Sequence, residues 1–206
     1  MKLKKTILTD ADGVLLNWEF AFNIWMQEHG FQTVKGYQFM YDMAERYGIP
    51  KEQVKKLVRQ FNESATIGYL PALRDAVQYV TKLADEGWEF HCITSLSKNK
   101  YAQRLRRKNL DKIFGKGVFT KLICLDTGDA KDDVLAKYKD SKLYWIEDKP
   151  DNAEAGLKQG LKPILVEHGH NMKGDYPYPK AKDWEHIYNI VTCLLYTSDA
   201  ADEHSW

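Results

Sequence analysis

The stretch that decides the fold lies near the start of this 206-residue chain and reads Ile7-Leu8-Thr9-Asp10-Ala11-Asp12-Gly13-Val14-Leu15-Leu16. It is a short apolar β run that ends on two carboxylates spaced two apart, followed by a glycine. In α/β folds, ligands bind at the carboxyl ends of the strands. Two carboxylates at one strand end repel each other unless a cation or a reacting phosphate lies between them, and a turn at Gly13 can aim both at one bound group. The segment therefore predicts a catalytic site, with a plain Asp-Gly turn as the alternative.

Composition places the chain among single-domain globular proteins, with room for one insertion. The net charge of +1 gives no sign of a polyanion-binding surface, so no stable nucleic-acid binding is expected. Three cysteines at unrelated spacings predict neither a disulfide framework nor a zinc site, which suits a reducing compartment. The apolar run before Asp10 is too short for a signal peptide, and no run approaches membrane-spanning length. We therefore expect a cytoplasmic protein without a membrane partner, whose oligomeric state the sequence leaves open.

The end of the chain differs in character from the rest. The segment from Cys193 to Glu203 matches the translation of a transposon-end sequencing adaptor. We therefore expect residues 193–206 to be a non-native tail, excluded from the fold, and the natural protein to end near Thr192. An ordinary C-terminal coil is the alternative.

Strands and helices are predicted to alternate along the rest of the chain. Four apolar runs are short, bounded by polar residues or glycine, and rich in β-branched or aromatic types; they are Glu89–Ile93, Lys121–Leu125, Leu143–Ile146 and Pro163–Glu167. Helical patterns lie between the runs, at Ala72–Glu86, Asn99–Asn109, Asp132–Lys139 and Asn152–Gln159. This alternation predicts an α/β fold with a doubly wound, mostly parallel sheet and helices on both faces.

The segment after the first strand is too long for a simple crossover. Residues 17–68 show three helical patterns, Trp18–His29, Tyr37–Tyr47 and Pro50–Asn62, separated by the stop signals Gly30 and Gly48-Ile49-Pro50. We predict a small helical cap at 17–68, inserted into a core formed by 1–16 and 69–192. Most of its many aromatic residues are expected in its own core, although one or two near the mouth could stack on a base.

Several polar residues that could form one site lie directly after the predicted strands, and one, Lys131, lies shortly before the strand at Leu143–Ile146. Each one alone has a structural explanation, as a helix cap, a turn or a solvated helix residue. In a doubly wound sheet they converge on one crevice, where carboxylates can hold Mg²⁺ and a hydroxyl, backbone N–H groups and a lysine can hold phosphate oxygens. The set comprises Asp10, Asp12, Thr94, Ser95, Lys131, Glu147, Asp148, Lys149 and Asp151.

In these motifs the chain resembles the haloacid dehalogenase-like (HAD) superfamily of phosphotransferases. The likeness runs through Asp10-Ala11-Asp12-Gly13-Val14, Thr94-Ser95, Lys131 and Glu147-Asp148. It implies a HAD-like fold with Asp10 as nucleophile, Asp12 as general acid and base, and Mg²⁺ held by Asp10, Asp148 and the Asp12 carbonyl. It also implies that Thr94, Ser95 and Lys131 hold the phosphoryl group, with Glu147, Lys149 and Asp151 beside the metal ligands.

Within that superfamily the chain is most similar to the 5′(3′)-deoxyribonucleotidases. The likeness includes an aromatic residue, Trp18, shortly after the first motif, and Lys149-Pro150-Asp151 in place of the family's Arg-Pro-Asp. It implies a nucleoside monophosphate substrate whose base stacks on Trp18. The alternative is that Trp18 has only a structural role and packs the cap against the core. Lys100 resembles a phosphate-side lysine of these enzymes and Lys98 could serve too, but Lys131 is preferred because it heads a helix shortly before the fourth motif.

Together these features predict a Mg²⁺-dependent hydrolase of a small phosphate monoester, acting through an aspartyl-phosphate. The same chemistry on a sugar phosphate, or on the 3′-phosphate of a polynucleotide, remains open. A non-catalytic binding module is also possible on fold grounds, although the intact carboxylates argue against it. A dehalogenase is disfavoured because it would lack the second carboxylate, Asp12.

Overall fold

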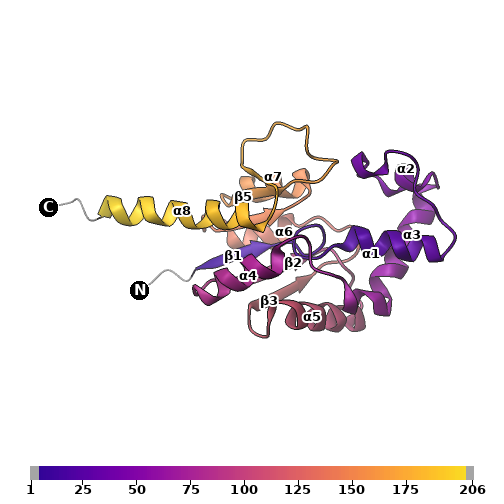
Figure 1. Cartoon of the computed structure of the whole chain (residues 1–206), viewed down its shortest axis with the longest axis horizontal. Coiled ribbons are helices and arrows are strands. Elements are labelled where there is room, and N and C mark those ends of the chain that lie inside the picture. Colours follow the sequence, from indigo (N-terminus) through magenta and orange to yellow (C-terminus); the bar gives the residue numbers. More distant parts are fainter. Residues whose placement is uncertain (1–4, 203–206) are drawn as a thin grey trace.

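The computed structural model describes the backbone of residues 5–202 and the side chains of residues 5–193. Within this part of the chain, the centre is an all-parallel sheet in the order β3-β2-β1-β4-β5-β6 (Figure 1). The strands are β1 Thr6–Thr9, β2 Glu89–Thr94, β3 Phe119–Cys124, β4 Tyr144–Glu147, β5 Lys162–Val166 and β6 Lys180–Ala181. The doubly wound α/β fold predicted from the sequence is confirmed.

The first strand lies at the centre of the sheet, between β2 and β4. Thr9 is level with Cys92 of β2 and with Ile146 of β4, so the carboxyl ends of the three strands lie side by side. All four residues of β1 are buried, as expected for a parallel strand covered on both faces. The two-residue strand β6 was not predicted, because it is too short to show a periodic pattern.

Helices cover both faces of the sheet, and alternate residues of β1 mark the two layers. Ile7 belongs to the core shared with α4 (Ala76–Asp85), α5 (Lys100–Phe114) and α8 (Trp184–Asp202). Leu8 belongs to the core shared with α6 (Asp132–Leu135) and α7 (Pro150–Lys158). The predicted helix from Asp132 to Lys139 occurs as α6 followed by a 3₁₀ turn, Ala136–Tyr138.

The helical insertion predicted after β1 is present and lies beyond one end of the sheet, on the side opposite the far end of α8 (Figure 1). Its elements are α1 Trp18–Glu28, η1 Tyr37–Phe39, α2 Met43–Tyr47, α3 Lys51–Glu63 and η2 Ala65–Tyr69. Its centre is aromatic: the ring of Phe22 lies 4.5 Å from that of Trp18 and 5.2 Å from that of Phe61.

The single helix predicted at Tyr37–Tyr47 is wrong. The chain forms the short 3₁₀ helix η1, becomes extended at Met40, and starts α2 afresh at Met43. Asp42 causes the new start, because its carboxylate accepts a hydrogen bond from the backbone N–H of Ala44 at 2.8 Å. An acidic N-cap inside an apparently helical pattern was the signal for the break.

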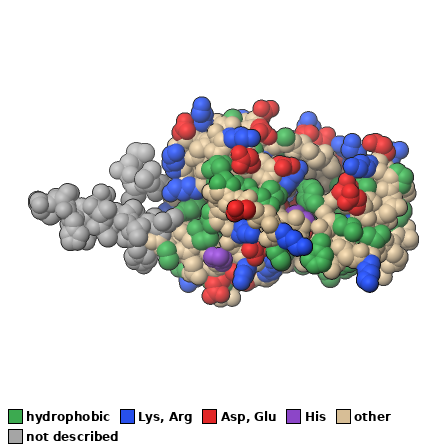
Figure 2. All heavy atoms as spheres, turned by 90° about the horizontal axis from the view of Figure 1, so that it is seen from above, with side chains coloured by type: hydrophobic (Ala, Val, Ile, Leu, Met, Phe, Trp, Pro, Cys, Tyr) green, Lys and Arg blue, Asp and Glu red, His purple; other side chains and the backbone are tan. Residues whose placement is uncertain are grey.

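Two further observations concern the surface and the end of the chain. Acidic and basic side chains are interspersed over the face shown in Figure 2. No helix within the described residues is long and apolar enough to cross a membrane. The segment predicted to be a non-native tail continues α8 as far as Asp202, but its side chains beyond Cys193 lie outside the described residues, so its origin stays a prediction.

Candidate active site

A cavity of about 1180 Å³ lies at the carboxyl ends of the central strands. One wall consists of residues that follow the strands of the core, and we call it the core wall: Asp10, Asp12, Thr94, Ser95, Lys131, Glu147 and Asp148. The opposite wall, the cap wall, comes from the inserted helices and includes Trp18, Glu19, Arg46 and Asn62. The predicted crevice therefore lies between the core and the inserted helices.

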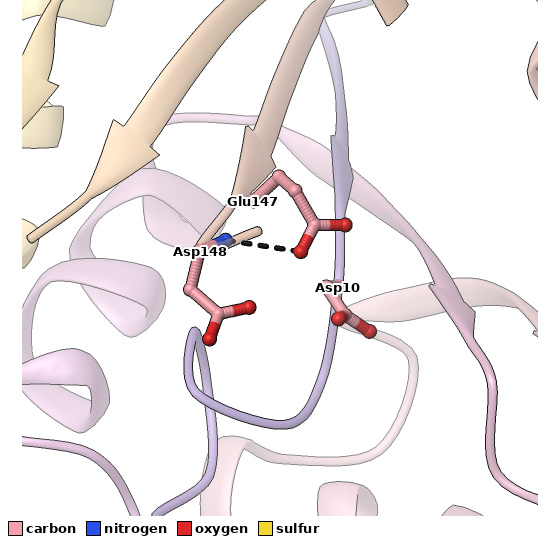
Figure 3. Close-up of side chains that lie close together, drawn as sticks. All are labelled: Asp10, Glu147 and Asp148. Carbon is pink, nitrogen blue, oxygen red and sulfur yellow. Dashed lines mark hydrogen bonds between the residues drawn. The ribbon is translucent and has the colours of Figure 1, made fainter. Parts of the chain in front are cut away.

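Three carboxylates of the core wall lie close together (Figure 3). Asp10 follows β1, Glu147 ends β4 and Asp148 follows it, and one oxygen of each lies within 4.8 Å of the others. Gly13 makes room for this cluster, because a Cβ atom there would lie only 2.4 Å from Asp148 Oδ2. Its φ of +76° is also a conformation that favours glycine.

Lys131 bridges two of these carboxylates. Its Nζ lies 2.7 Å from Asp10 Oδ2 and 2.7 Å from Glu147 Oε2, and the side chain is only 1% exposed. Burial alone would lower the pKa of Lys131, but the two carboxylates outweigh burial and raise it above its usual value. The lysine is therefore a fixed positive charge that holds Asp10 in place.

The acids of the cluster are not equivalent. Burial raises the pKa of Asp10 to about 7 against the opposing effect of Lys131, and burial with repulsion from Glu147 raises the pKa of Asp148. Glu147 is buried as well, but Lys131 and the surrounding hydrogen bonds hold its pKa below the usual value. The charge of Lys131 therefore does not outweigh burial at Asp10 and Asp148, and a further positive charge would favour their ionised forms.

A divalent cation fits this donor set. The oxygens of Glu147 already accept hydrogen bonds from the N–H groups of Asp148 and Lys149, from Lys131 and from Asn152. Glu147 thus accepts from four donors, whereas Asp10 accepts from two, Ala11 and Lys131, so Asp10 and Asp148 are the better oxygen ligands for Mg²⁺. The Asp12 carboxylate is not part of the cluster, and a role for its carbonyl stays a prediction.

The Asp12 side chain is held elsewhere, by an arginine that the sequence did not reveal. Arg106 of α5 approaches Asp12 with two nitrogens: Nη1 lies 2.5 Å from Oδ1 and Nη2 lies 3.0 Å from Oδ2. The Arg106 side chain is fully buried. Its position on the helix was the available signal, because Ala102, Arg106 and Leu110 follow at four-residue intervals on the buried face.

The predicted phosphate-binding hydroxyls lie beside the carboxylates. Thr94 and Ser95 both line the cavity. The Thr94 hydroxyl is buried and has no hydrogen-bond partner among the described residues, which leaves it available to a ligand. The Ser95 hydroxyl donates to the carbonyl oxygen of Asp129 at 2.8 Å, so only its backbone remains to bind phosphate.

The other predicted lysines lie at or beyond the rim. Lys100 is exposed on α5, bonds Gln103 at 3.4 Å and is not among the residues that line the cavity, so the structure does not bring it to the site. Lys98 is also exposed, 4.0 Å from Asp129. Lys149 lines the rim, with Asp151 3.7 Å away.

Trp18 lies in the cap wall and also ties the cap to the core. Its ring stacks on Phe22, and its Nε1 donates to Asn62 Oδ1 at 2.9 Å. Asn62 in turn donates to the Leu96 carbonyl of the core at 3.0 Å. Arg46, also buried in this wall, forms an ion pair with Glu19 at 2.7 Å. The structure is thus compatible with both predicted roles of Trp18.

Two residues of the loop after β5, His168 and Asn171, make hydrogen bonds to turns that carry site residues. His168 Nε2 lies 2.7 Å from the Gly13 carbonyl, so the ring is assigned as a donor through that nitrogen. Asn171 donates to the Asp148 carbonyl at 2.7 Å. Burial lowers the pKa of His168 to about 4, which keeps the ring neutral at pH 7. These two residues fix the turns that carry Gly13 and Asp148.

Sequence comparison gives one partial relative. No protein-family model matches the chain. Over 154 residues it is 28% identical to the uncharacterised 32.4 kDa protein in the Gp30-rIII intergenic region of enterobacteria phage T4, a match that covers 71% of this chain and 54% of that protein. The chain thus spans about half the length of the curated relative it matches.

Solved structures of similar architecture include HAD-superfamily hydrolases. A haloacid dehalogenase-like hydrolase from Streptococcus pneumoniae gives a TM-score of 0.62 at 15% identity, covering 92% of this chain and 100% of that one. A predicted phosphatase from Clostridium acetobutylicum gives 0.60 at 16%, covering 95% and 100%. The HAD-hydrolase YfnB from Bacillus subtilis, bound to magnesium, gives 0.59 at 14%, covering 92% and 99%. At these identities the likeness shows the fold, which is HAD-like.

Proposed function

We propose that this protein is a Mg²⁺-dependent phosphomonoester hydrolase that uses Asp10 as its nucleophile. The observation that carries the proposal is the position of Asp10 at the end of β1. It lies 2.7 Å from the buried Lys131 and within 4.8 Å of the Asp148 carboxylate. Similarity to structures described as a phosphatase and as a magnesium-bound hydrolase supports the same chemistry.

The nucleophile is held at both of its oxygens. Asp10 Oδ1 accepts from the Ala11 N–H at 2.6 Å, and Oδ2 accepts from Lys131. Asp10 and Asp148 would hold the Mg²⁺, which when bound offsets the negative charge of the carboxylate and the phosphate. The free hydroxyl of Thr94 and the charge of Lys131 would bind the oxygens of the phosphoryl group.

Two steps follow from this placement. Asp10 forms a bond to phosphorus while the bond from phosphorus to the ester oxygen breaks, and Asp12, which enters this step protonated, gives its proton to the leaving oxygen. Water then attacks the aspartyl-phosphate, Asp12 takes its proton, and inorganic phosphate leaves with Asp10 restored. Arg106 acts through Asp12 as a positioning residue, because its buried guanidinium donates hydrogen bonds to both carboxylate oxygens.

We propose a nucleoside monophosphate as the substrate, a small molecule whose base stacks on Trp18. The position of Trp18 in the cap wall supports this assignment. The core wall would accept a sugar phosphate equally well, because it contacts only the phosphoryl group. The substrate is therefore decided by residues of the cap.

Phosphate release from a panel of deoxy- and ribonucleoside monophosphates and sugar phosphates tests the proposal. Wild-type protein should release phosphate with Mg²⁺, lose activity in EDTA and regain it when Mg²⁺ is restored. Asp10→Asn should lower the rate by about a thousandfold or more at unchanged melting temperature, since an amide cannot act as the nucleophile.

Three results would count against this function. Full activity in metal-free buffer would remove Asp148 from its proposed role. More than a few per cent of the wild-type rate in a folded Asp10→Asn variant would remove Asp10. Activity confined to sugar phosphates would keep the reaction but exclude the nucleotide substrate.

A further inference from the structure

The outer face of α5 carries four cations that the cavity does not use. Lys100, Arg104, Lys108 and Lys112 are all exposed and follow one another at four-residue intervals. Four residues of α-helix advance about 6 Å, so the charges form a regular row, which we call the basic stripe. The opposite face of α5, which includes Arg106, is buried in the core. The basic stripe is therefore a separate surface from the active site.

The charge of this surface is not balanced within α5. The helix contains six basic residues and one acidic residue, although the whole chain has a net charge of only +1. The one acid, Asp111, lies 3.9 Å from Arg107, which is not part of the basic stripe. Successive members of the stripe are like charges at i and i+4, which destabilise a helix. Lys100 also lies in the first turn, where the helix dipole disfavours a cation.

Two exposed tyrosines accompany the basic stripe. Tyr101 is 48% exposed and Tyr69 is 73% exposed. The Arg104 guanidinium lies 6.0 Å from the Tyr101 ring centroid, and Lys112 Nζ lies 5.8 Å from that of Tyr69. A ring beside a cation suits a nucleotide, because the base can stack on the ring while the phosphate pairs with the cation.

We propose that the basic stripe, together with Tyr69 and Tyr101, binds single-stranded nucleic acid along α5. A single strand repeats one phosphate per nucleotide and leaves its base faces free to stack, whereas a duplex hides them and an anionic membrane has none. The near-neutral net charge gave no sign of such a partner because it averages over the whole surface, whereas binding depends on the local potential. The proposal does not depend on the phosphatase activity.

Fluorescence anisotropy of a labelled oligodeoxythymidine tests this surface in the full chain. Wild type should bind at low salt and weaken steeply as salt rises, because counterions are released on binding. Arg104→Glu with Lys108→Glu and Lys112→Glu should weaken binding by about a hundredfold or more. The matched control, Lys35→Glu with Lys137→Glu and Lys173→Glu, changes the net charge equally at exposed sites elsewhere and should stay within about fivefold of wild type.

A second pair of variants tests the aromatic contribution. Tyr69→Ala with Tyr101→Ala should weaken binding by about tenfold or more, since a stacked base is lost at each ring. Phosphate release from a small substrate should be unchanged in all of these variants, because none of the substituted residues lines the cavity. Melting curves establish that each variant is folded. If the triple charge-reversal variant unfolds, the same three residues and the three control residues are changed to Gln instead of Glu.

Four outcomes would overturn the proposal. They are no binding by wild type, equal loss in the stripe variant and its control, undiminished binding by the tyrosine variant, and preference for phosphatidylserine vesicles over the oligonucleotide. The first two would show that the basic stripe is a solvated face. Undiminished binding by the tyrosine variant would show that the surface binds polyanions without base stacking. Preference for the vesicles would show that the partner is an anionic membrane.

Discussion

The two walls of the cavity differ in how their side chains are held. In the core wall, charged groups from strand ends are buried against one another, as Lys131 is between Asp10 and Glu147. In the cap wall, Trp18 and Asn62 make stacking and neutral hydrogen-bond contacts beside one ion pair, that of Arg46 with Glu19. Under the proposed function, the core wall would act on the phosphoryl group of any substrate, and the cap wall would contact the rest of the substrate. Substitutions in the core wall should therefore impair every substrate, and those in the cap wall only some.

The largest effect is expected at Lys131. Lys131→Ala leaves Asp10 and Glu147 buried without their cation, and breaking such a pair costs about 3–5 kcal/mol of unfolding free energy. Turnover of every phosphate ester should fall with it. Lys100→Ala, which removes the competing exposed lysine, should change the unfolding free energy by less than about 0.5 kcal/mol. Urea denaturation and phosphate release measure both, and equal losses in the two variants would erase the distinction between the lysines.

The next effect is expected at Arg106, which positions Asp12 for the proposed proton transfer. Arg106→Gln should let Asp12 leave its productive position, which lowers the rate for alkyl phosphates by about a hundredfold, the usual scale of general acid catalysis. p-Nitrophenyl phosphate should lose less than about tenfold, because its leaving group needs no proton. Arg104→Gln, on the exposed face of the same helix, is the control. A loss that is the same for both leaving groups would make Arg106 purely structural.

His168, which contacts the Gly13 carbonyl, should make the stability of the protein depend on pH. Burial holds the pKa of His168 at about 4 in the folded protein, against 6.5 for an unperturbed histidine. Between these pH values the unfolded chain binds the additional proton, so stability falls as pH drops from about 6.5 to about 4, by roughly 3 kcal/mol at most. His168→Gln should remove this part of the dependence. Urea denaturation at pH 7.5 and pH 4.5 in EDTA measures it, and identical pH dependence in the two proteins would contradict the burial argument.

The smallest effect is expected in the cap wall and should depend on the substrate. Trp18→Ala should lower kcat/KM for nucleoside monophosphates by about ten- to a hundredfold, because base stacking contributes about 1–3 kcal/mol. p-Nitrophenyl phosphate offers no base and should be nearly unaffected. Trp25→Ala removes a cap ring of equal size that does not line the cavity. If both tryptophan variants lower kcat/KM alike for both substrates, Trp18 has only a structural role in the cap. The cap wall would then not determine substrate specificity through this residue.

Local patterns in the sequence were enough to predict the architecture. The apolar runs around β1, β2, β4 and β5 predicted the parallel sheet, because strand formation and burial are expressed in consecutive residues. The helix at Tyr37–Tyr47 failed because the Asp42 cap competes with continuation of the helix. The carboxylates Asp10 and Asp148 could be expected to meet because both follow neighbouring parallel strands.

The sequence by itself determined the sheet, the insertion of the cap and the acidic strand ends, since each depends on residues close together in the chain. Only the tertiary structure decided that Lys131 rather than Lys100 enters the cavity, and that Arg106 holds Asp12 across 94 positions of sequence. It also decided that Asn62 joins Trp18 to the core. The physical reason is that a side chain's partner is set by the packing of whole helices against the sheet, which no local pattern encodes.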